Sequence, residues 1–521
     1  MGYSCCGDSV EITLIDAGFT NDTSRYVTKY RFHSQKVRKN KYLLLTLQLL
    51  EGLFLVNVII EERFIMKNDN LLTEGNVFHV LLAFSVPFLV ANVIQALYGA
   101  VDLMVIGWYC TPASVAAVST GTQVTQIITS MVSGLTLGGT ILVGKYTGMK
   151  DEERTCRTIG TTLSVFAVVA LVLTVGMLIF RDAILAALKT PATSMDEARQ
   201  YVTICFCGIF FICGYNAISA ILRGYGDSRR PMYFVAMSCV LNIAGDIIFV
   251  KYLGLGAAGT ALATVLSQSI SMICSIVYLN RKKFIFTFTL KNLRIDRDRL
   301  KELAMVGIPI SSQECMVRLS FLYLTSVTNR LGVNAAAAVG IASKYDVFAM
   351  LPATSIASAL AAITAQNYGA GKPERAKKSL AAGIGFAVLA SSIFFLWAQL
   401  SPQTMIGLFN TNPDIIEAGI PFFHSCSFDY LAVSFVFCLN GFMNGRSKTV
   451  FTMVSCCFGA LALRMPLIWL AYTCCPDNLF VIGLIAPAVS GFMAFYTLLF
   501  VIRQLKQDRT ERQKALTLRR V

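Results

Sequence analysis

The sequence is poor in charged residues, which make up only 14% of its 521 positions. Soluble domains carry about 25% charged residues, so this composition does not fit a soluble enzyme. Hydrophobic residues account for 55% of the chain. They gather in recurring apolar runs of about 20 residues, each long enough to cross a hydrocarbon core of ~30 Å. We therefore predict an integral membrane protein in contact with the lipid bilayer.

Histidine is nearly absent, with three residues, and the 16 cysteines form no Cys-x-x-Cys pair. Metal sites need such groups at close spacing, so we expect no stable metal and no cofactor. Gly144–Gly148 is not a nucleotide-binding loop, because no Lys-Ser or Lys-Thr follows its second glycine. His424 alone does not supply a catalytic pair. We therefore expect a protein that is not an enzyme and does not use ATP.

The formal net charge of +15 does not indicate a nucleic-acid partner, because the cations do not gather on one face. They lie in alternate connections between apolar runs, while the other connections are nearly free of them. Basic connections stay in the cytoplasm, so we expect both termini there, in a bacterial inner membrane. The basic connections are 145–157, 223–230, 281–301, 372–378, 446–448 and the tail from 503.

The apolar runs predict an all-α fold with twelve transmembrane helices. The expected ranges are 78–108, 114–142, 155–180, 198–222, 231–252, 256–280, 300–331, 335–364, 376–400, 416–443, 449–473 and 479–504.

The two halves of this region resemble each other. Phe84-Ser-Val-Pro87 corresponds to Val306-Gly-Ile-Pro309, and Gly226-Asp-Ser-Arg229 corresponds to Gly445-Arg-Ser-Lys448. Both copies start on the same side, which predicts two six-helix lobes related by a pseudo-two-fold axis along the membrane normal. The expected parts are a first lobe (66–285), a cytoplasmic linker (286–300), a second lobe (301–505) and a basic cytoplasmic tail (506–521).

Residues 1–65 differ from the rest of the chain. A polar, basic stretch from Arg25 to Lys41 precedes one apolar segment, Leu43–Ile60. No small-residue cleavage site follows, as a signal peptide would require. The segment is either an extra helix ahead of the bundle or, as we hypothesise, not translated natively because synthesis starts at Met66. The intact mass of the natively expressed chain distinguishes these alternatives.

The ordered motifs of both halves resemble the multidrug and toxic compound extrusion (MATE) family, in the bacterial branch with an Asp in the first helix. They are Tyr98-Gly-Ala-Val-Asp102, Leu222-Arg-Gly-Tyr-Gly-Asp227, Leu241-Asn-Ile-Ala-Gly-Asp246 and Gln366-Asn-Tyr-Gly-Ala-Gly-Lys-Pro-Glu-Arg375. The resemblance implies a secondary antiporter that exports small organic, often cationic compounds. Inward movement of H⁺ or Na⁺ would drive it by alternating access between the lobes. We expect a monomer.

Two acidic residues inside predicted helices are the main candidates for the ion and cargo site. A charge near the bilayer centre costs a few kcal/mol, so the presence of Asp102 and Asp246 inside predicted helices needs a structural or functional explanation. Removal from water disfavours the charged form of a carboxyl group, which allows proton uptake and release. An ionised pair can instead hold Na⁺ transiently with oxygens of Asn242 and Thr264. Alternatively, both residues cap or bridge helices and never change protonation.

The resemblance implies the same first-lobe site. It carries over two carboxylates and three polar neighbours: Asp102, Asp246, Tyr201, Asn242 and Thr264. Pro87 matches the proline at which the first helix of the family can bend, and its missing N–H makes a kink there expected.

The second lobe has its own polar residues, which include His424 and Arg464. Asp429 matches a carboxylate used in some branches of the family. Glu314 departs from the family pattern, and Arg318, four residues later, can simply neutralise it. Lys344 resembles a basic position of the eighth helix. It is expected either to contact substrate or to pair with Asp346 or Asp429.

The competing function is a lipid-linked oligosaccharide flippase of related architecture. Such proteins handle anionic diphosphate carriers, so their cavity is expected to be lined by Arg and Lys. The acidic first lobe disfavours this alternative.

Overall fold

The computed structural model describes residues 3–6, 9–15, 27–33, 72–188, 190–282, 284–289, 292–475 and 478–518. The chain consists of two units, 1–65 and 66–521. In the first unit, β1 (Tyr3–Cys6), β2 (Ser9–Ile15) and β3 (Val27–His33) form an antiparallel sheet in that order. The helix considered for Leu43–Ile60 lies outside the described residues.

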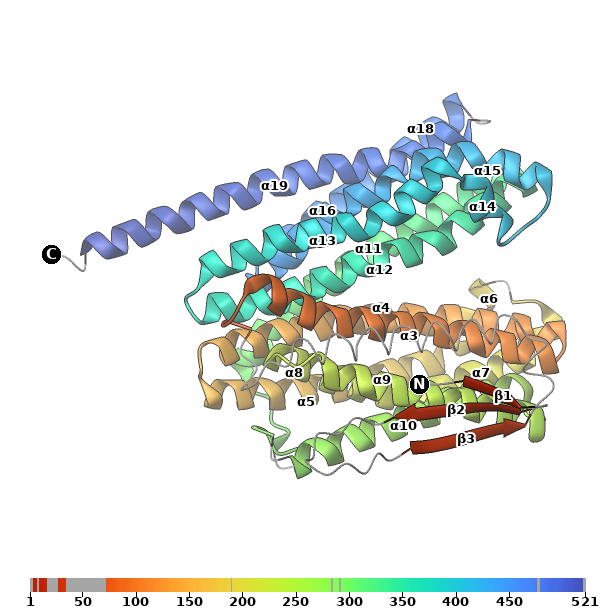
Figure 1. Ribbon diagram of the computed structural model, residues 1–521, viewed down its shortest axis with the longest axis horizontal. Coiled ribbons are helices and arrows are strands. Elements are labelled where there is room, and N and C mark those ends of the chain that lie inside the picture. Colours follow the sequence, from red (N-terminus) through yellow and green to blue (C-terminus); the bar gives the residue numbers. More distant parts are fainter. Residues whose placement is uncertain are drawn as a thin grey trace. The chain divides into compact units, whose positions relative to one another are not determined.

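The described part of the second unit consists of helices and their connections (Figure 1). Its first half contains α3 (Val77–Tyr109), α4 (Pro112–Gly148), α5 (Glu152–Ile179), α6 (Arg181–Ala187), η1 (Ala192–Ser194), α7 (Met195–Cys207), α8 (Ile209–Tyr225), α9 (Arg229–Asp246), η2 (Ile247–Tyr252) and α10 (Gly256–Arg281). Its second half contains α11 (Arg297–Thr328), η4 (Asn329–Leu331), α12 (Val333–Gly369), α13 (Pro373–Leu400), α14 (Pro402–Gly407), α15 (Pro413–Cys426), α16 (Phe428–Gly445), α17 (Thr449–Cys457), η5 (Phe458–Arg464), α18 (Met465–Cys474) and α19 (Leu479–Leu518).

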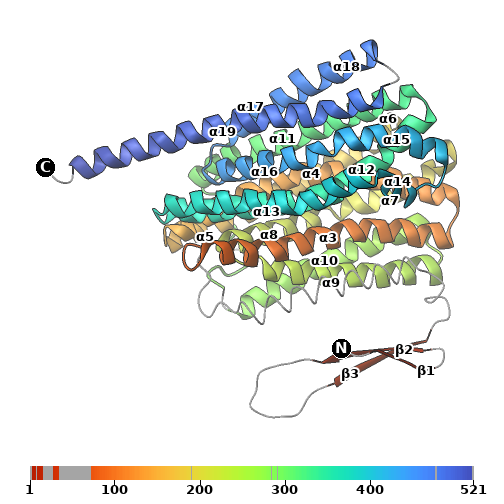
Figure 2. The ribbon, with the colours of Figure 1, turned by 45° about the horizontal axis from the view of Figure 1, so that its top comes forward.

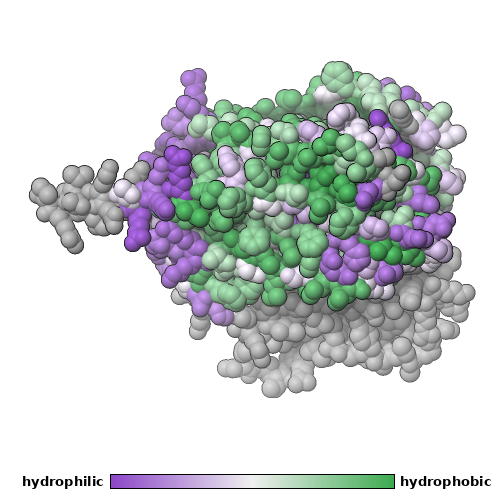
Figure 3. Space-filling view, turned by 90° about the horizontal axis from the view of Figure 1, so that it is seen from above, coloured by the Kyte–Doolittle hydropathy of each residue, from purple (hydrophilic) through white to green (hydrophobic). Residues whose placement is uncertain are grey.

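Ten helical segments of the described chain are long and apolar enough to cross a membrane, and the bent pair α7–α8 makes an eleventh. The α11 helix, predicted from the sequence as a further span, has 32 residues, includes Glu314 and Arg318, and is not among these apolar segments. Figure 3 shows a largely apolar face with hydrophilic residues gathered toward its ends. For the described part of the second unit, the expected all-helical membrane fold is thus confirmed. The largest boundary differences are in α19, which continues to Leu518 instead of ending near 504, and in α4, which continues to Gly148 instead of ending near 142.

The helices of each half lie together, and the halves meet along α3, α4, α11 and α12 (Figures 1 and 2). Small residues permit the closest approaches. A Cβ on Gly138 would lie 2.9 Å from the Cα of Gly307, and a Cβ on Gly148 would overlap the backbone of Gln366. These glycines therefore set the spacing between the halves.

One end of the bundle carries the basic connections, and we call it the basic end. There the halves are joined by side-chain hydrogen bonds. Gln366 donates from Nε2 to the Gly224 carbonyl (2.8 Å) and accepts from the Leu72 N–H (3.1 Å). Tyr146 donates to Glu302 (2.6 Å). The opposite end, marked by the α3–α4 connection and the start of α12, is called the far end.

The segment between the halves packs on the first half. Phe286 is buried beside Ile159 and Ile221. The Asp296 N–H donates to Thr161 Oγ1 (3.1 Å), and Asp296 then caps the start of α11. The described part of the segment expected as a linker therefore packs against the first half.

Candidate functional site

Three helices of the first half bring four polar side chains together in the interior, and we call them the acidic cluster: Asp102 on α3, Asn242 and Asp246 on α9, and Thr264 on α10. Asp102 is 4% exposed and Asp246 is fully buried. The Asp102 carboxyl interacts with Asp246, Asn242 and Thr264. Asn242 Nδ2 donates to Thr264 Oγ1 at 3.4 Å. All four residues were candidates from the sequence.

The acidic cluster has more acceptors than donors. Asp102 Oδ1, both carboxylate oxygens of Asp246, Asn242 Oδ1 and the hydroxyl of Tyr98 are buried without a hydrogen-bond partner among the described residues. No described ion pair involves either carboxylate. Buried polar groups are normally paired, because leaving them unpaired costs free energy. This arrangement has the chemistry of a site that accepts a proton or a small cation.

Local helix geometry supports these positions. Asn242 and Asp246 lie one turn apart on α9, so both point to the same side. Directly after Asp246 the helix widens into the π-helical turn η2, a feature often found at functional sites. Pro87 is buried inside α3, which continues through it to Tyr109.

The α7 helix contributes one neighbour of the acidic cluster, Tyr201. Tyr201 is 3% exposed, its hydroxyl lies 3.4 Å from Thr122 Oγ1, and it interacts with Asp102. One turn earlier, Glu197 has one buried carboxylate oxygen without a hydrogen-bond partner among the described residues. Its Oε2 lies 3.9 Å from a Cβ built on Gly256, at the start of α10, and the sequence analysis did not single it out. The signal was its spacing of four residues from Tyr201, which places both on one helix face.

The second half contains a charge-compensated group of residues, which we call the Arg464 cluster: Asp346, Asp429, Tyr430 and Arg464. Arg464 Nη2 lies 3.6 Å from Asp429 Oδ2, and the two side chains are 11% and 6% exposed. Asp346 interacts with Asp429, Tyr430 and Arg464. A cavity of about 20 Å³ is lined by the two carboxylates and the guanidinium.

Lys344 does not belong to the Arg464 cluster. It is exposed, and no described ion pair joins it to Asp346 or Asp429, so the alternative pairing considered from the sequence is not formed. Glu314 is half-buried and Arg318 is exposed. None of the described ion pairs links these two side chains, but Glu314 interacts electrostatically with Arg318.

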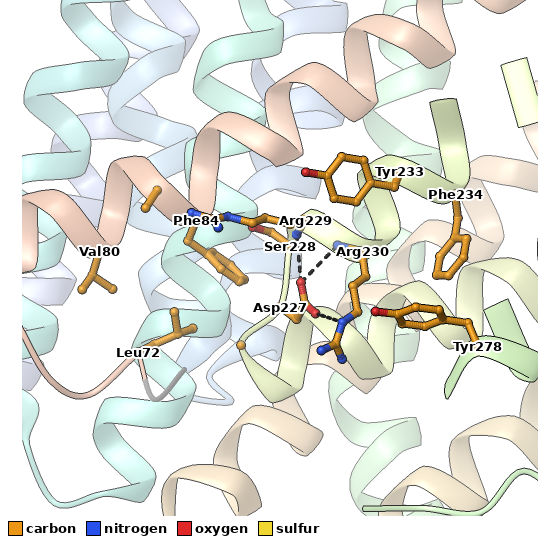
Figure 4. A pocket seen from close by; sticks show the side chains of 12 residues that line it. Leu72, Val80, Phe84, Asp227, Ser228, Arg229, Arg230, Tyr233, Phe234 and Tyr278 are labelled. Atoms are coloured by element: carbon orange, nitrogen blue, oxygen red, sulfur yellow. Dashed lines mark hydrogen bonds and ion pairs between the residues drawn. The ribbon is translucent and has the colours of Figure 1, made fainter. Parts of the chain in front are cut away.

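A larger cavity, of about 400 Å³, lies at the basic end between the start of α3 and the start of α9 (Figure 4). The Asp227 carboxylate accepts from the backbone N–H groups of Arg229 (3.0 Å) and Arg230 (3.1 Å) and pairs with the Arg230 side chain (2.9 Å). From the position before the N-cap Ser228, Asp227 thus satisfies the first two N–H groups of α9. The cavity shares no lining residue with the acidic cluster.

Comparison with known proteins gives two matches to one family. The sequence profile of the MatE family matches residues 87–248 and again 309–470, which together cover more than half of the chain. The first matched segment contains Asp102 and Asp246, and the second contains the Arg464 cluster.

Among individual proteins, the chain is 31% identical over 353 residues to the probable multidrug resistance protein YoeA of Bacillus subtilis, covering 66% of this chain and 76% of that protein. It is 25% identical over 401 residues to the probable multidrug resistance protein YpnP of the same organism, covering 76% and 88%. Among solved structures, it resembles an outward-facing MATE family transporter of the MOP superfamily (TM-score 0.79, 21% identity, 85% and 99% covered). Because the sequence identity to this solved structure is only 21%, the similarity supports the fold and not a function.

Proposed function

Because the chain belongs to the MatE family of transport proteins, we propose that it exports small organic compounds, often cationic ones, in exchange for inward H⁺ or Na⁺. Its relatives YoeA and YpnP are described as probable multidrug resistance proteins. The proposed location is the bacterial inner membrane, with the basic end and both termini in the cytoplasm.

One observation carries the proposal: the acidic cluster holds two buried carboxylates with unpaired oxygens and no described cation beside them. A proton or Na⁺ can neutralise this group, and so can the cationic part of a cargo. Because the ligands compete for one negative site, binding of the ion on one side favours release of the cargo. Asn242, Thr264 and Tyr201 supply the neighbouring oxygens.

The proposed transport cycle moves the two lobes, 66–285 and 301–505, relative to each other. In the structure the halves are joined at the basic end. Rocking of one lobe against the other would open that end and close the far end. A lipid-linked oligosaccharide flippase remains the alternative, but an acidic interior disfavours an anionic diphosphate carrier.

Efflux of ethidium from cells that express the full-length chain tests the proposal. We expect Asp102→Asn and Asp246→Asn to reduce efflux by roughly tenfold or more, because each removes the charge that binds ion and cargo. Asp182→Asn is the matched control, since this exposed carboxylate lies on α6 outside the acidic cluster.

The coupling ion is identified in inverted vesicles by comparing ethidium uptake after a Na⁺ jump with uptake after a pH jump. Undiminished efflux in both aspartate variants at matched expression would reject the acidic cluster as the coupling site.

A further inference from the structure

The cavity of about 400 Å³ at the basic end has a buried apolar floor and a partly exposed aromatic mouth (Figure 4). Leu72, Val80 and Phe84 form the floor, and each of them is 3% exposed. Tyr233 on α9 and Tyr278 on α10 line the mouth and are 40% and 38% exposed. A cavity of this volume is large enough to take part of an amphiphilic molecule.

The polar lining of the cavity has an excess of positive charge. Arg229 and Arg230 line it together with one carboxylate, Asp227. The Arg230 guanidinium is held in place, because its Nε lies 2.9 Å from Asp227 Oδ2 and its central carbon lies 5.7 Å from the centre of the Tyr278 ring. The Arg230 side chain is still 36% exposed. The cavity therefore presents a positioned guanidinium, a group suited to phosphate oxygens.

Polarity changes along the cavity in the direction of the helix axes. Residues 227–230 lie at the level of the basic end, where α9 begins. Phe234 follows Arg229 by about 8 Å of helix, and Phe84 follows the first residue of α3 by about 10 Å, at 1.5 Å per residue. The lining thus passes from cations at the basic end to apolar side chains deeper in the bundle. A phospholipid in a bilayer has the same order, with its headgroup outside and its acyl chains inside.

The surface beside the mouth has the composition expected where a protein meets the edge of a membrane. On α10, Ile273 and Val277 are 52% and 43% exposed, which suits contact with acyl chains. Tyrosines such as Tyr233 and Tyr278 are enriched where the apolar core of a membrane meets its headgroups. Basic pockets between transmembrane helices on the cytoplasmic side bind anionic headgroups, and the basic end is the side proposed above to lie in the cytoplasm.

We propose that this cavity binds one anionic phospholipid, with the phosphate on Arg230 and an acyl chain along Val80 and Phe84. The lipid is a resident ligand and not a cargo, because the cavity shares no lining residue with the acidic cluster. This inference goes beyond the export function and does not depend on it.

Leu72 connects the cavity to the second half of the chain. Its N–H donates to Gln366 Oε1 (3.1 Å), and its carbonyl accepts from Asn367 Nδ2 (3.2 Å). Lys372 donates to the carbonyl of Thr73 (3.1 Å). One wall of the cavity is thus bonded to the second half, while the opposite wall, α9, belongs to the first. Because the complete cavity exists only while these bonds hold, a bound lipid favours the joined basic end.

Lipid titration of the purified full-length protein, followed by native mass spectrometry, tests the site. Phosphatidylglycerol is compared with phosphatidylcholine of the same acyl chains. We expect wild type to bind phosphatidylglycerol about fivefold more tightly and Arg230→Gln to lose this preference, because Arg230 attracts the net negative headgroup. Ala83→Trp, which fills the cavity from α3, should weaken the binding of both lipids.

Arg154→Gln is the matched control. Arg154 also lies at the basic end and pairs through Nε with a carboxylate three residues earlier, Asp151 (3.2 Å), but it does not line the cavity. A preference for phosphatidylglycerol that Arg230→Gln retains, or that Arg154→Gln loses as well, overturns the inference. Unweakened binding to Ala83→Trp does the same. Glycerol 3-phosphate separates a lipid site from a simple anion site, since equally tight binding of this chain-free headgroup would reject the lipid.

Hydrogen–deuterium exchange of the full-length protein in nanodiscs tests the link to the basic end. The peptide 360–369 contains Gln366 and Asn367 and contributes no residue to the cavity lining. Phosphatidylglycerol in place of phosphatidylcholine should slow its exchange roughly twofold or more in wild type and leave it unchanged in Arg230→Gln. If the lipid binds as expected but exchange does not slow, the lipid site stands and its effect on the basic end is overturned.

Discussion

Arg464 gives the carboxylates of the second half a neighbouring cation, which the described residues of the acidic cluster do not have. Its guanidinium lies 3.6 Å from Asp429 and interacts with Asp346. In the acidic cluster, Asp102 and Asp246 have no described ion-pair partner. The two halves share a fold but differ in charge balance, which is why we assign ion coupling to the first half.

Replacing Arg464 tests whether its positive charge stabilises the carboxylates of the second half. In Arg464→Gln the buried Asp429 and the half-buried Asp346 lose their cation, and removing one partner of a buried ion pair typically costs ~3–5 kcal/mol. We expect a lower midpoint of thermal unfolding in detergent, measured by intrinsic fluorescence. Arg330→Gln, at an exposed cation, should leave the midpoint within about 1 °C. An unchanged midpoint for Arg464→Gln would show that the pair does not stabilise the fold.

Residue-level prediction succeeded where spacing within one helix was sufficient. Asn242 and Asp246 were placed on one face of α9 by their separation of one turn, and the structure has both buried. The approach of Asp102 to Asp246 depends on the packing of α3 against α9, which spacing does not encode, so only the family resemblance supplied it. The cation beside Asp429 is Arg464 and not Lys344. This pairing also depends on helix packing, so spacing within one helix could not predict it.

At the level of elements, breaks interrupt two spans that the sequence shows as continuous. The α7–α8 span bends by 44° at Gly208, and Ser427 separates α15 from α16. Two other spans contain π-helical turns, η2 and η5. Hydropathy predicted the spans but could not predict these breaks, because the apolar pattern continues through them. At the break between α7 and α8, a close contact with a neighbouring helix is present.

Gly208 shows such a contact. A Cβ at this position would overlap the side chain of Val265 on α10, and β-branched side chains have little rotamer freedom. We expect Gly208→Ala to destabilise the protein by ~1–3 kcal/mol, as overpacking does, measured by thermal unfolding in detergent. Adding Val265→Ala should restore part of this loss.

Gly385→Ala is the control for Gly208, because no atom lies within 4 Å of a Cβ built there. If Gly208→Ala and Gly385→Ala behave alike, the contact with Val265 does not determine the break between α7 and α8.

For the whole molecule, the internal repeat in the sequence correctly predicted two similar halves. Two matched segments, 87–248 and 309–470, correspond to the two halves expected from the paired motifs. The docking of the connecting segment on α5 was not predictable, since Phe286 and Asp296 contact residues more than a hundred positions away. Hydropathy also gave no sign of which end of the bundle holds the halves together.

Gln366 is central to that closed basic end. It is fully buried on α12, donates to the Gly224 carbonyl on α8 and accepts from the Leu72 N–H ahead of α3. One side chain thus satisfies two backbone groups of the first half. Asn367, its neighbour, adds a bond to the Leu72 carbonyl (3.2 Å).

Gln366→Ala should loosen the basic end without disturbing the far end. Each lost hydrogen bond contributes about 1 kcal/mol, so the joined state should become less populated by roughly tenfold or more. Hydrogen–deuterium exchange of the full-length protein measures this as faster exchange in peptides covering 140–148 and 360–369. Gln123→Ala, at an exposed amide nearer the far end, should leave both peptides unchanged. Equal exchange in the two variants would mean that glycine-mediated packing alone, such as Gly148 on the Gln366 backbone, keeps the halves together.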